Sequence, residues 1–381
     1  MKQPPLNDEN SRSYFQLPPE THYFLSAAVG PLYKKVVEEC TSWNQMLAKK
    51  GAIADPEIFK LMNDVRQPLA KILGISDPKR LAIGPNTSTN MNIVAMGLKD
   101  LFSKREVITS SMEFPSSSLP WKHHGFKLIN LGDKIEDQDI LDRVGPDTAA
   151  VVLSAIQYST GFRKDFSFIG VELKKLGVPL IVNGTQAIGA FPLDIEKNHI
   201  SFFSATGHKW LCSGFSGAVL YCDSFWSQKM KPPFLGWLSL QEPFSLNIDD
   251  PVLNEFPQNM ELGTPNILGL VALKKASEIV LDIGLENISK RILGLSSLFY
   301  EATRDLDHCR KSIVALSGPE SGIMSFETDK SEYVRKLLEE KNYYVSVRKG
   351  LLRVSIHFFN SESEVLELAK DLTTLLSMDR S

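Results

Sequence analysis

Short apolar runs alternate with helix-like segments over much of the chain, and this alternation limits the possible folds more than any other feature. The runs are rich in β-branched and aromatic residues, as buried strands are. They lie at Val107–Ile108, Ala149–Ser154, Val178–Val182, Phe202–Ala205 and Ala218–Tyr221. Segments with helical spacing include Pro56–Leu73, followed by Gly74, and Phe166–Leu176, followed by Gly177. The pattern predicts a mostly parallel α/β sheet, in which ligands bind at the carboxyl ends of the strands.

A segment rich in hydroxyl side chains, Gly84–Asn90, comes directly before an amphipathic helix. Apolar residues recur there at helical spacing, at Met91, Val94, Ala95, Leu98, Leu101 and Phe102. Backbone N–H groups, the hydroxyls of Thr87 and Ser88 and the positive end of the helix dipole together suit an anion. Ordinary N-capping by Thr87 or Ser88 explains this stretch equally well.

Lys209 lies on a tight polar turn between two predicted strands, flanked by His208 and Trp210. A lysine held among apolar strands loses its proton readily and can act as the amine nucleophile of a Schiff base. A solvated loop lysine is the simpler interpretation of this residue alone. Other polar or aromatic residues that follow strand-like runs are Thr87, Phe114, Tyr158 and Asn183. We expect one edge of the sheet to bring them close to Lys209.

The chain from Leu285 onward has a different pattern, which predicts a small α+β domain. Strands are expected at Ile323–Phe326, Tyr344–Arg348 and Leu351–His357, and helices at Glu332–Lys341 and Glu362–Leu376. We therefore divide the chain into an N-terminal segment (1–21), a large domain (22–284) and a small domain (285–381).

Arg353 lies inside an otherwise apolar predicted strand. A buried guanidinium is costly unless it has an anionic partner, and its planar fork suits two-pronged binding of a carboxylate. The sequence leaves two interpretations, a structural salt bridge and a site for a substrate carboxylate.

Four motifs occur in a fixed order: Asn183-Gly-Thr-Gln186, Thr206-Gly-His-Lys209, Gly263-Thr-Pro-Asn266 and Arg353-Val-Ser355. Their order and spacing resemble those of class V aminotransferases, which include cysteine desulfurases, kynureninase and isopenicillin-N epimerase. The resemblance extends from about residue 22 to 375. It implies the fold type I architecture of pyridoxal-phosphate (PLP) enzymes, with a mostly parallel seven-stranded sheet in the large domain. It also implies PLP as cofactor, an amino-acid substrate and a homodimer with shared active sites.

The resemblance assigns roles by position. Lys209 forms the Schiff base and moves protons, Phe114 stacks on the cofactor ring, and Arg353 binds the substrate α-carboxylate. Asn183 faces the ring nitrogen, and Gln186 and Tyr158 approach the 3′-oxygen. The residues assigned to the phosphate are Thr87, Ser88, Thr206, His208 and Thr264 of the partner subunit. The segment Tyr23–Pro31 is expected at the mouth of the site, and residues 222–260 are expected near the dimer interface.

Two departures from the family pattern narrow the chemistry. Cysteine desulfurases carry a sulfur-accepting cysteine between the last two strands, where this chain has only Lys349-Gly350. Transfer of sulfur through a persulfide at this place is therefore not expected. Asn183 replaces the family aspartate, so we expect a largely unprotonated ring nitrogen and chemistry such as β-elimination rather than transamination. Transamination, elimination, epimerisation and C–C cleavage all stay open.

Composition argues against several kinds of partner and against a metal site. The net charge of −3 over 381 residues gives no electrostatic reason to expect nucleic acid or an anionic membrane as partner. The N-terminus has no signal-peptide core, no run is long enough to span a bilayer, and four scattered cysteines predict neither disulfides nor a zinc site. We expect a cytoplasmic protein without a metal. The alternatives are a PLP-fold binding protein without turnover and a nicotinamide dehydrogenase, although the latter lacks a Gly-x-Gly-x-x-Gly turn.

Overall fold

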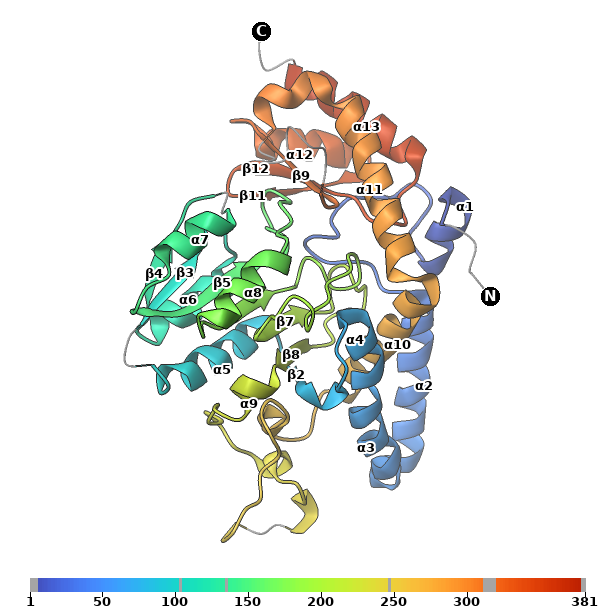
Figure 1. Ribbon diagram of the computed structural model, residues 1–381. Coiled ribbons are helices and arrows are strands. Elements are labelled where there is room, and N and C mark those ends of the chain that lie inside the picture. The colour runs from blue at the N-terminus through green and yellow to red at the C-terminus, as the bar shows by residue number, and fades with distance from the viewer. Residues whose placement is uncertain (1–5, 103–104, 134–135, 246–247, 311–319, 378–381) are drawn as a thin grey trace.

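The computed structural model describes residues 6–102, 105–133, 136–245, 248–310 and 320–377; residues 1–5 of the predicted N-terminal segment are outside these ranges. Its centre is a seven-stranded sheet (Figure 1) in the order β2-β8-β7-β6-β5-β3-β4. The strands are β2 Leu81–Gly84, β3 Glu106–Thr109, β4 Lys127–Asn130, β5 Thr148–Ser154, β6 Leu180–Asn183, β7 Phe202–Thr206 and β8 Ala218–Cys222. Six of these strands run in the same direction and β8 runs in the opposite one, so the predicted mostly parallel sheet is confirmed.

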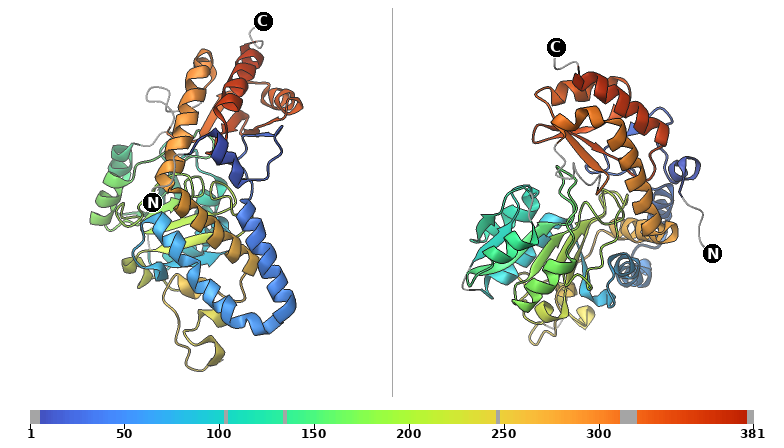
Figure 2. Two further views of the ribbon diagram at one scale, coloured as in Figure 1. Left: turned by 90° about the vertical axis from the view of Figure 1, so that its right-hand side faces the viewer. Right: turned by 45° about the horizontal axis from the view of Figure 1, so that its top comes forward.

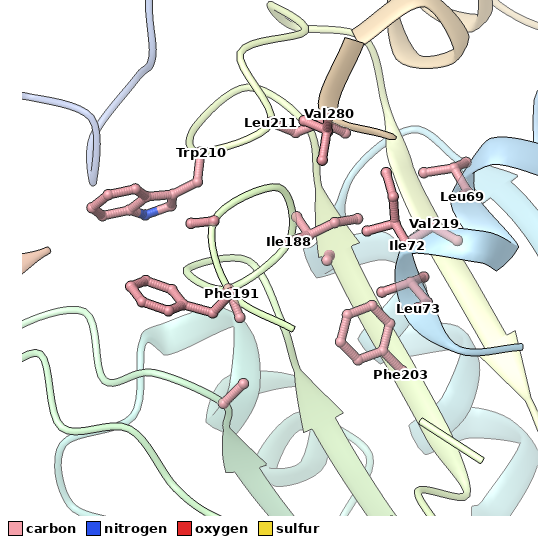
Figure 3. Close-up of a cluster of buried hydrophobic side chains, with 14 of the residues drawn as sticks. Leu69, Ile72, Leu73, Ile188, Phe191, Phe203, Trp210, Leu211, Val219 and Val280 are labelled. Carbon is pink, nitrogen blue, oxygen red and sulfur yellow. The ribbon is translucent and has the colours of Figure 1, made fainter. Parts of the chain in front are cut away.

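Helices cover both faces of this sheet, because its strands alternate between two apolar cores. In β5, Val151 and Leu153 belong to one core and Ala150 and Val152 to the other. The first core includes residues of α4 (Arg66–Leu73), α8 (Ser167–Lys175) and α10 (Ile267–Ile283), and the second includes those of α5 (Thr87–Lys99) and α6 (Pro115–His123). Figure 3 shows part of the first core, where Ile72 of α4 lies beside Val219 of β8 and Leu73 of α4 lies beside Phe203 of β7.

The helix predicted over Pro56–Leu73 is wrong in one respect: it is two helices, α3 (Asp55–Asp64) and α4. Pro68 has no N–H to donate to the carbonyl of Asp64, and its ring would clash with that carbonyl, so a continuous helix is disfavoured at this point. Within α4, Pro68 is the third residue, where no intrahelical N–H is needed. Gly74 ends α4 in the left-handed conformation, with φ 64°, as the sequence predicts.

The C-terminal part forms a second sheet of three antiparallel strands in the order β11-β12-β9. Its elements are β9 Ile323–Glu327, β10 Tyr343–Tyr344, β11 Ser346–Arg348, β12 Leu351–Ser355, α11 Leu285–Ala302, α12 Ser331–Glu340 and α13 Glu362–Ser377. Figure 2 shows these helices packed over one face of the small sheet. The remaining elements are α1 Asp8–Ser11, β1 His22–Tyr23, α2 Lys34–Lys50, α7 Asp137–Arg143 and α9 Ser224–Ser227.

The single strand predicted at Tyr344–Arg348 is also wrong, because its two halves pair with different partners. β10 pairs in parallel with β1 near the N-terminus, whereas β11 pairs with β12. The N-terminal strand thus joins the C-terminal unit, and Leu25 forms a further bridge to Ser355. The change from α10 to α11 falls at Gly284, and the domain division at that residue stays a proposal. Within the described ranges, no helix is both long and apolar enough to cross a membrane.

Candidate active site

A cavity of about 400 Å³ lies at the carboxyl ends of β5, β6 and β7, beside the small sheet. All of the predicted site residues except Thr264 line it. These are Thr87, Ser88, Phe114, Tyr158, Asn183, Gln186, Thr206, His208, Lys209 and Arg353. Thr264 lies instead in another hollow of about 520 Å³, with Phe215 and Phe234. One chain therefore assembles the predicted site apart from the residue assigned to the partner subunit.

The loop after β7 carries Lys209 into this cavity, and Gly30, which follows β1, holds the loop in place. The N–H of Gly30 donates to the carbonyl of His208 over 2.8 Å. A Cβ at residue 30 would lie only 2.1 Å from the carbonyl oxygen of Lys209, so no larger residue fits without movement. Burial and then the charges of Arg353 and Arg348 lower the pKa of Lys209 to about 7. Its amine is therefore partly neutral at physiological pH, as a nucleophile requires.

The N-terminus of α5 forms one end of the cavity. Its N-cap is Asn86, whose side chain accepts the N–H of Thr89, so the alternative of capping by Thr87 or Ser88 is wrong. Asparagine satisfies the cap with its short carbonyl-bearing side chain, which leaves the hydroxyls of Thr87 and Ser88 for other contacts. The first N–H groups of α5 have no acceptor within the helix and point out of its end.

His208 and Thr206 also line the cavity. Thr206 Oγ1 lies 2.8 Å from Nδ1 of His208 and donates to the carbonyl of Gly217 over 3.3 Å. Burial and the neighbouring Lys209 lower the pKa of His208 to about 4, so its ring is neutral at physiological pH. The ring stacks on Phe215, with the centroids 5.5 Å apart. The neutral ring brings no charge and has one N–H, so His208 can donate to an anion from Nε2 only if the Thr206 hydroxyl turns from Gly217 and donates to Nδ1.

Two amide side chains line the floor of the cavity. Asn183 donates from Nδ2 to Ser117 over 2.9 Å and accepts the N–H of Thr185 at Oδ1 over 3.1 Å. Gln186 donates to the carbonyl of Ala27 and accepts from the indole N–H of Trp210. Each amide keeps one N–H and one lone pair unused by these contacts.

Phe114 precedes α6 and presents its ring to the cavity. The side chain is 41% exposed, its centroid lies 5.6 Å from Nζ of Lys209, and its ring meets Tyr158 edge to face. An exposed ring beside an amine offers a face on which a planar cofactor can stack.

Arg353 of β12 is 1% exposed, yet among the described residues no carboxylate lies within 4 Å of it. Its Nε donates to Ser346 and its Nη1 to the carbonyl of Tyr158, whereas Nη2 has no hydrogen-bond partner in the described part of the chain. Burial and then the nearby Arg348 lower the pKa of Arg353 to about 9. The structural salt bridge considered from the sequence is absent from the described residues, so the guanidinium has a vacant donor beside the cavity.

Sequence reasoning missed several residues of the site. Arg348 lines the cavity from β11, and Ser154 and Thr185 line it beside Asn183. Ser117 is not among the lining residues, but it accepts a hydrogen bond from Asn183, and its hydroxyl in turn bonds to Glu113. Position offers one signal for these residues, since Glu113 adjoins Phe114 and Thr185 lies inside the Asn183–Gln186 motif.

The residues of the cavity fit PLP. The helix end with its hydroxyls suits a phosphate, Phe114 offers a ring face, and Lys209 supplies an amine with a lowered pKa. The unpartnered Nη2 of Arg353 is suited to a carboxylate of the substrate.

Comparison with known proteins finds one family model and several curated relatives that cover most of the chain. Residues 22–368 match the sequence model of the family described as aminotransferase class V. The chain is 24% identical to a probable cysteine desulfurase of Methanothermobacter thermautotrophicus, covering 94% of this chain and 95% of that protein. It is 25% identical to an isopenicillin N epimerase of Amycolatopsis lactamdurans, covering 96% and 98%.

Solved structures show the same fold. The apo cysteine desulfurase from Thermococcus onnurineus superposes with a TM-score of 0.88 at 22% identity, covering 99% of this chain and 100% of that one. The cystine C–S lyase C-DES, in complex with its product cysteine persulfide, superposes with a TM-score of 0.85 at 22% identity, covering 93% and 98%.

Proposed function

Because the chain belongs to the aminotransferase class V family, we propose that it acts on an α-amino acid, with Lys209 as the cofactor-bearing residue. The family consists of PLP-dependent enzymes, so the chain is an enzyme and PLP is its cofactor. The observation that supports an amino-acid substrate is Nη2 of Arg353, a buried donor without a partner in the described residues, beside the cavity that holds Lys209. An α-carboxylate would satisfy this donor.

Each group of residues has a separate task in this proposal. The N-terminus of α5, with Thr87 and Ser88, holds the phosphate together with Thr206 and His208. Phe114 and Asn183 orient the ring. When bound, PLP supplies the electron sink that weakens the bonds at the substrate α-carbon. Lys209, with its pKa near 7, accepts or returns a proton at Nζ close to that carbon.

We further propose that no cysteine of this chain accepts sulfur. Lys349 and Gly350 form a two-residue turn with φ of 50° and 78°, and Arg348 pairs directly with Leu351 across it. The thiol of Cys212 contacts the backbone carbonyl of Lys209. It is buried, however, and burial raises the pKa of this thiol well above the ordinary value. A buried thiol of this kind is a poor nucleophile. Several relatives are named probable cysteine desulfurases, so this part of the proposal departs from their names.

Among the reactions of the family, β-elimination best suits the neutral Asn183. An asparagine in contact with the ring nitrogen favours its protonated form less than the family aspartate would, which makes the ring a weaker electron sink than an aspartate would. Elimination needs less delocalisation into the ring than transamination does. C-DES, a cystine C–S lyase of the same fold, has cysteine persulfide as its reaction product.

We also propose a homodimer in which Thr264 serves the site of the partner subunit. Thr264 lies outside the Lys209 cavity of its own chain, in a hollow bordered by Phe215 and Phe234. These two rings are 80% and 46% exposed and border the same hollow. Exposed apolar side chains that gather in one place are typical of a surface that contacts another protein. Composition supports a cytoplasmic location.

A borohydride experiment tests the proposal. The purified protein should be yellow, and reduction should fix the cofactor on one peptide, which mass spectrometry should assign to Lys209. Lys209→Ala should lose the colour and the fixed cofactor. Lys164→Ala, which removes another lysine with a 9% exposed side chain, should keep both. Fixation on another lysine would refute the proposed site.

A yellow protein that does not respond to any amino acid would support the second candidate, a PLP-fold protein without turnover. Such a protein would bind PLP at Lys209, yet no amino acid of a panel would change the cofactor absorbance. The enzyme should respond to at least one amino acid, and the response identifies its substrate class.

A further inference from the structure

Glu113 is a buried carboxylate to which the proposed function gives no task. It follows β3 and directly precedes Phe114, and it is 6% exposed. No lysine, arginine or histidine of the described residues lies within 4 Å of it. An ionised carboxylate without a cation in such a place must be held by hydrogen bonds alone.

Three donors converge on Glu113. The backbone N–H of Ser154 donates over 2.7 Å and the hydroxyl of Ser154 donates to the other oxygen. The hydroxyl of Ser117 is the third donor. Burial raises the pKa of Glu113, and the hydrogen bonds from Ser154 and Ser117 oppose that rise. Three donors match the needs of an ionised carboxylate, which only accepts.

Ser117 connects this carboxylate to Asn183. The N–H of Thr185 can only donate, so the Asn183 atom that it meets is the oxygen, and Nδ2 therefore faces Ser117. Since Ser117 accepts from Asn183, its own proton is available to Glu113. The hydrogen bonds run in one direction, from Asn183 through Ser117 to Glu113.

We propose that Glu113 is a positioning residue that provides, through Ser117 and Asn183, the negative charge that residue 183 itself lacks, and so helps to keep a proton on the ring nitrogen of bound PLP. The proposal rests on the proposed function, which places that nitrogen beside Asn183. Hydrogen bonds that end on an ion polarise one another, which makes Oδ1 of Asn183 a stronger acceptor. The charge itself also acts through a weakly polar interior.

Other charges around the cavity oppose this effect. Lys209 comes from the loop after β7, Arg348 from β11 and Arg353 from β12, and all three disfavour a further positive charge on the ring. His208 and Tyr158 are the other titratable groups lining the cavity. All of them stay in place when Glu113 is changed, so a difference between variants isolates the carboxylate.

The test is the pH dependence of the nitrogen-15 shift of ring-labelled PLP in the holoenzyme, compared with Glu113→Gln. The substitution keeps shape and removes charge. We expect the protonation midpoint to fall by about one pH unit or more, in line with the loss of a nearby opposite charge. Midpoints that agree within about 0.3 unit, or no titration in either protein between about pH 5 and 10, would overturn the proposal.

Glu364→Gln is the matched control. Glu364 lies in α13, is 5% exposed, and bonds to Asn360 and to Arg12 of the N-terminal segment. Its neutralisation should therefore leave the protonation midpoint of the ring nitrogen unchanged. An equal shift in both variants would overturn the assignment to Glu113.

Ser117→Ala serves if Glu113→Gln does not fold. It keeps the carboxylate and removes the connection, and it should also lower the midpoint, whereas an unchanged midpoint would contradict the proposal. A wild-type protein that holds no PLP would refute the proposed function instead, so the two failures are distinguishable.

Discussion

Lys209 and Arg353 line the same cavity, and burial together with the Arg353 charge lowers the pKa of Lys209 to about 7. With Arg348, they give this cavity three cationic side chains, while no aspartate or glutamate is among its lining residues. The site is therefore organised for anions. The phosphate and the α-carboxylate are the two anions that the proposed function provides.

The lowered pKa of Lys209 predicts how PLP incorporation depends on pH. A neutral amine is needed, and below pH 7 its fraction falls about tenfold per unit, whereas an ordinary lysine would still be gaining neutral amine up to about pH 10. We expect the incorporation rate of the apoenzyme to rise from pH 5 to 7 and to level off above about pH 8. Stopped-flow absorbance measures the rate. A rate that continues to rise between pH 8 and 10 would contradict the lowered pKa of Lys209.

Arg348→Ala should move this profile to higher pH. Arg348 is one of the charges that lower the pKa of Lys209, after burial and Arg353, so its removal lets Lys209 hold its proton more tightly. The midpoint of the profile should rise. Arg335→Ala is the control, because Arg335 pairs with Glu332 and Glu339 on α12 and does not line the cavity.

Arg353→Ala should weaken amino-acid binding by roughly 30-fold or more, because it removes the buried charged donor that faces the carboxylate, a pair worth ~2–5 kcal/mol. Cofactor content should stay near normal. Titration of the cofactor absorbance with an amino acid and with the matching amine separates the roles. The amine lacks a carboxylate and should bind almost unchanged, so equal losses for both ligands would make Arg353 structural.

Asn183→Asp should raise the pKa of the ring nitrogen and speed α-proton exchange of a bound amino acid. A carboxylate next to the nitrogen favours its protonated form by ~1–3 pKa units. Exchange of the α-proton for deuterium, followed by proton NMR, measures the effect. An unchanged exchange rate with a protonated wild-type ring would contradict the expectation drawn from Asn183.

Gly30→Ala should loosen the Lys209 loop and reduce cofactor retention. Its new Cβ would meet the carbonyl oxygen of Lys209 at 2.1 Å, and backbone cannot yield as a flexible side chain does. Gly145→Ala is the matched control, since nothing lies within 4 Å of its added Cβ. PLP release during dialysis should be faster in the first variant and unchanged in the second.

Where a motif follows a strand, the sequence predicted which residues come together in one cavity, while their roles stay a prediction. Lys209 and Asn183 come at the ends of apolar runs, and parallel strands must bring such ends together. The same rule could not find the connection from Asn183 through Ser117 to Glu113, because no local pattern relates a residue of α6 to the end of β6. Thr264 is a different case, since its predicted partner site is not part of a single chain.

Local chemistry explains the errors of the sequence analysis. Thr87 and Asn86 are both good N-caps, and only the backbone conformation determines which residue begins the helix. Pro68 carried enough information to divide Pro56–Leu73, because a missing N–H acts on the residue four positions earlier. The division between β10 and β11 depends on the distant strand β1, which apolar periodicity within Tyr344–Arg348 cannot reveal.

The pairing of β1 with β10 has a consequence for the order in which the protein is built. Ala27, Ala28 and Val29 form one wall of the cavity, yet the strand before them pairs with Tyr343 and Tyr344, and Leu25 with Ser355. These partners leave the ribosome long after the large sheet is complete. The wall is therefore fixed only after β10 and β12 have been made, and we expect a nascent chain that ends before β10 to hold PLP more weakly than one that includes both strands.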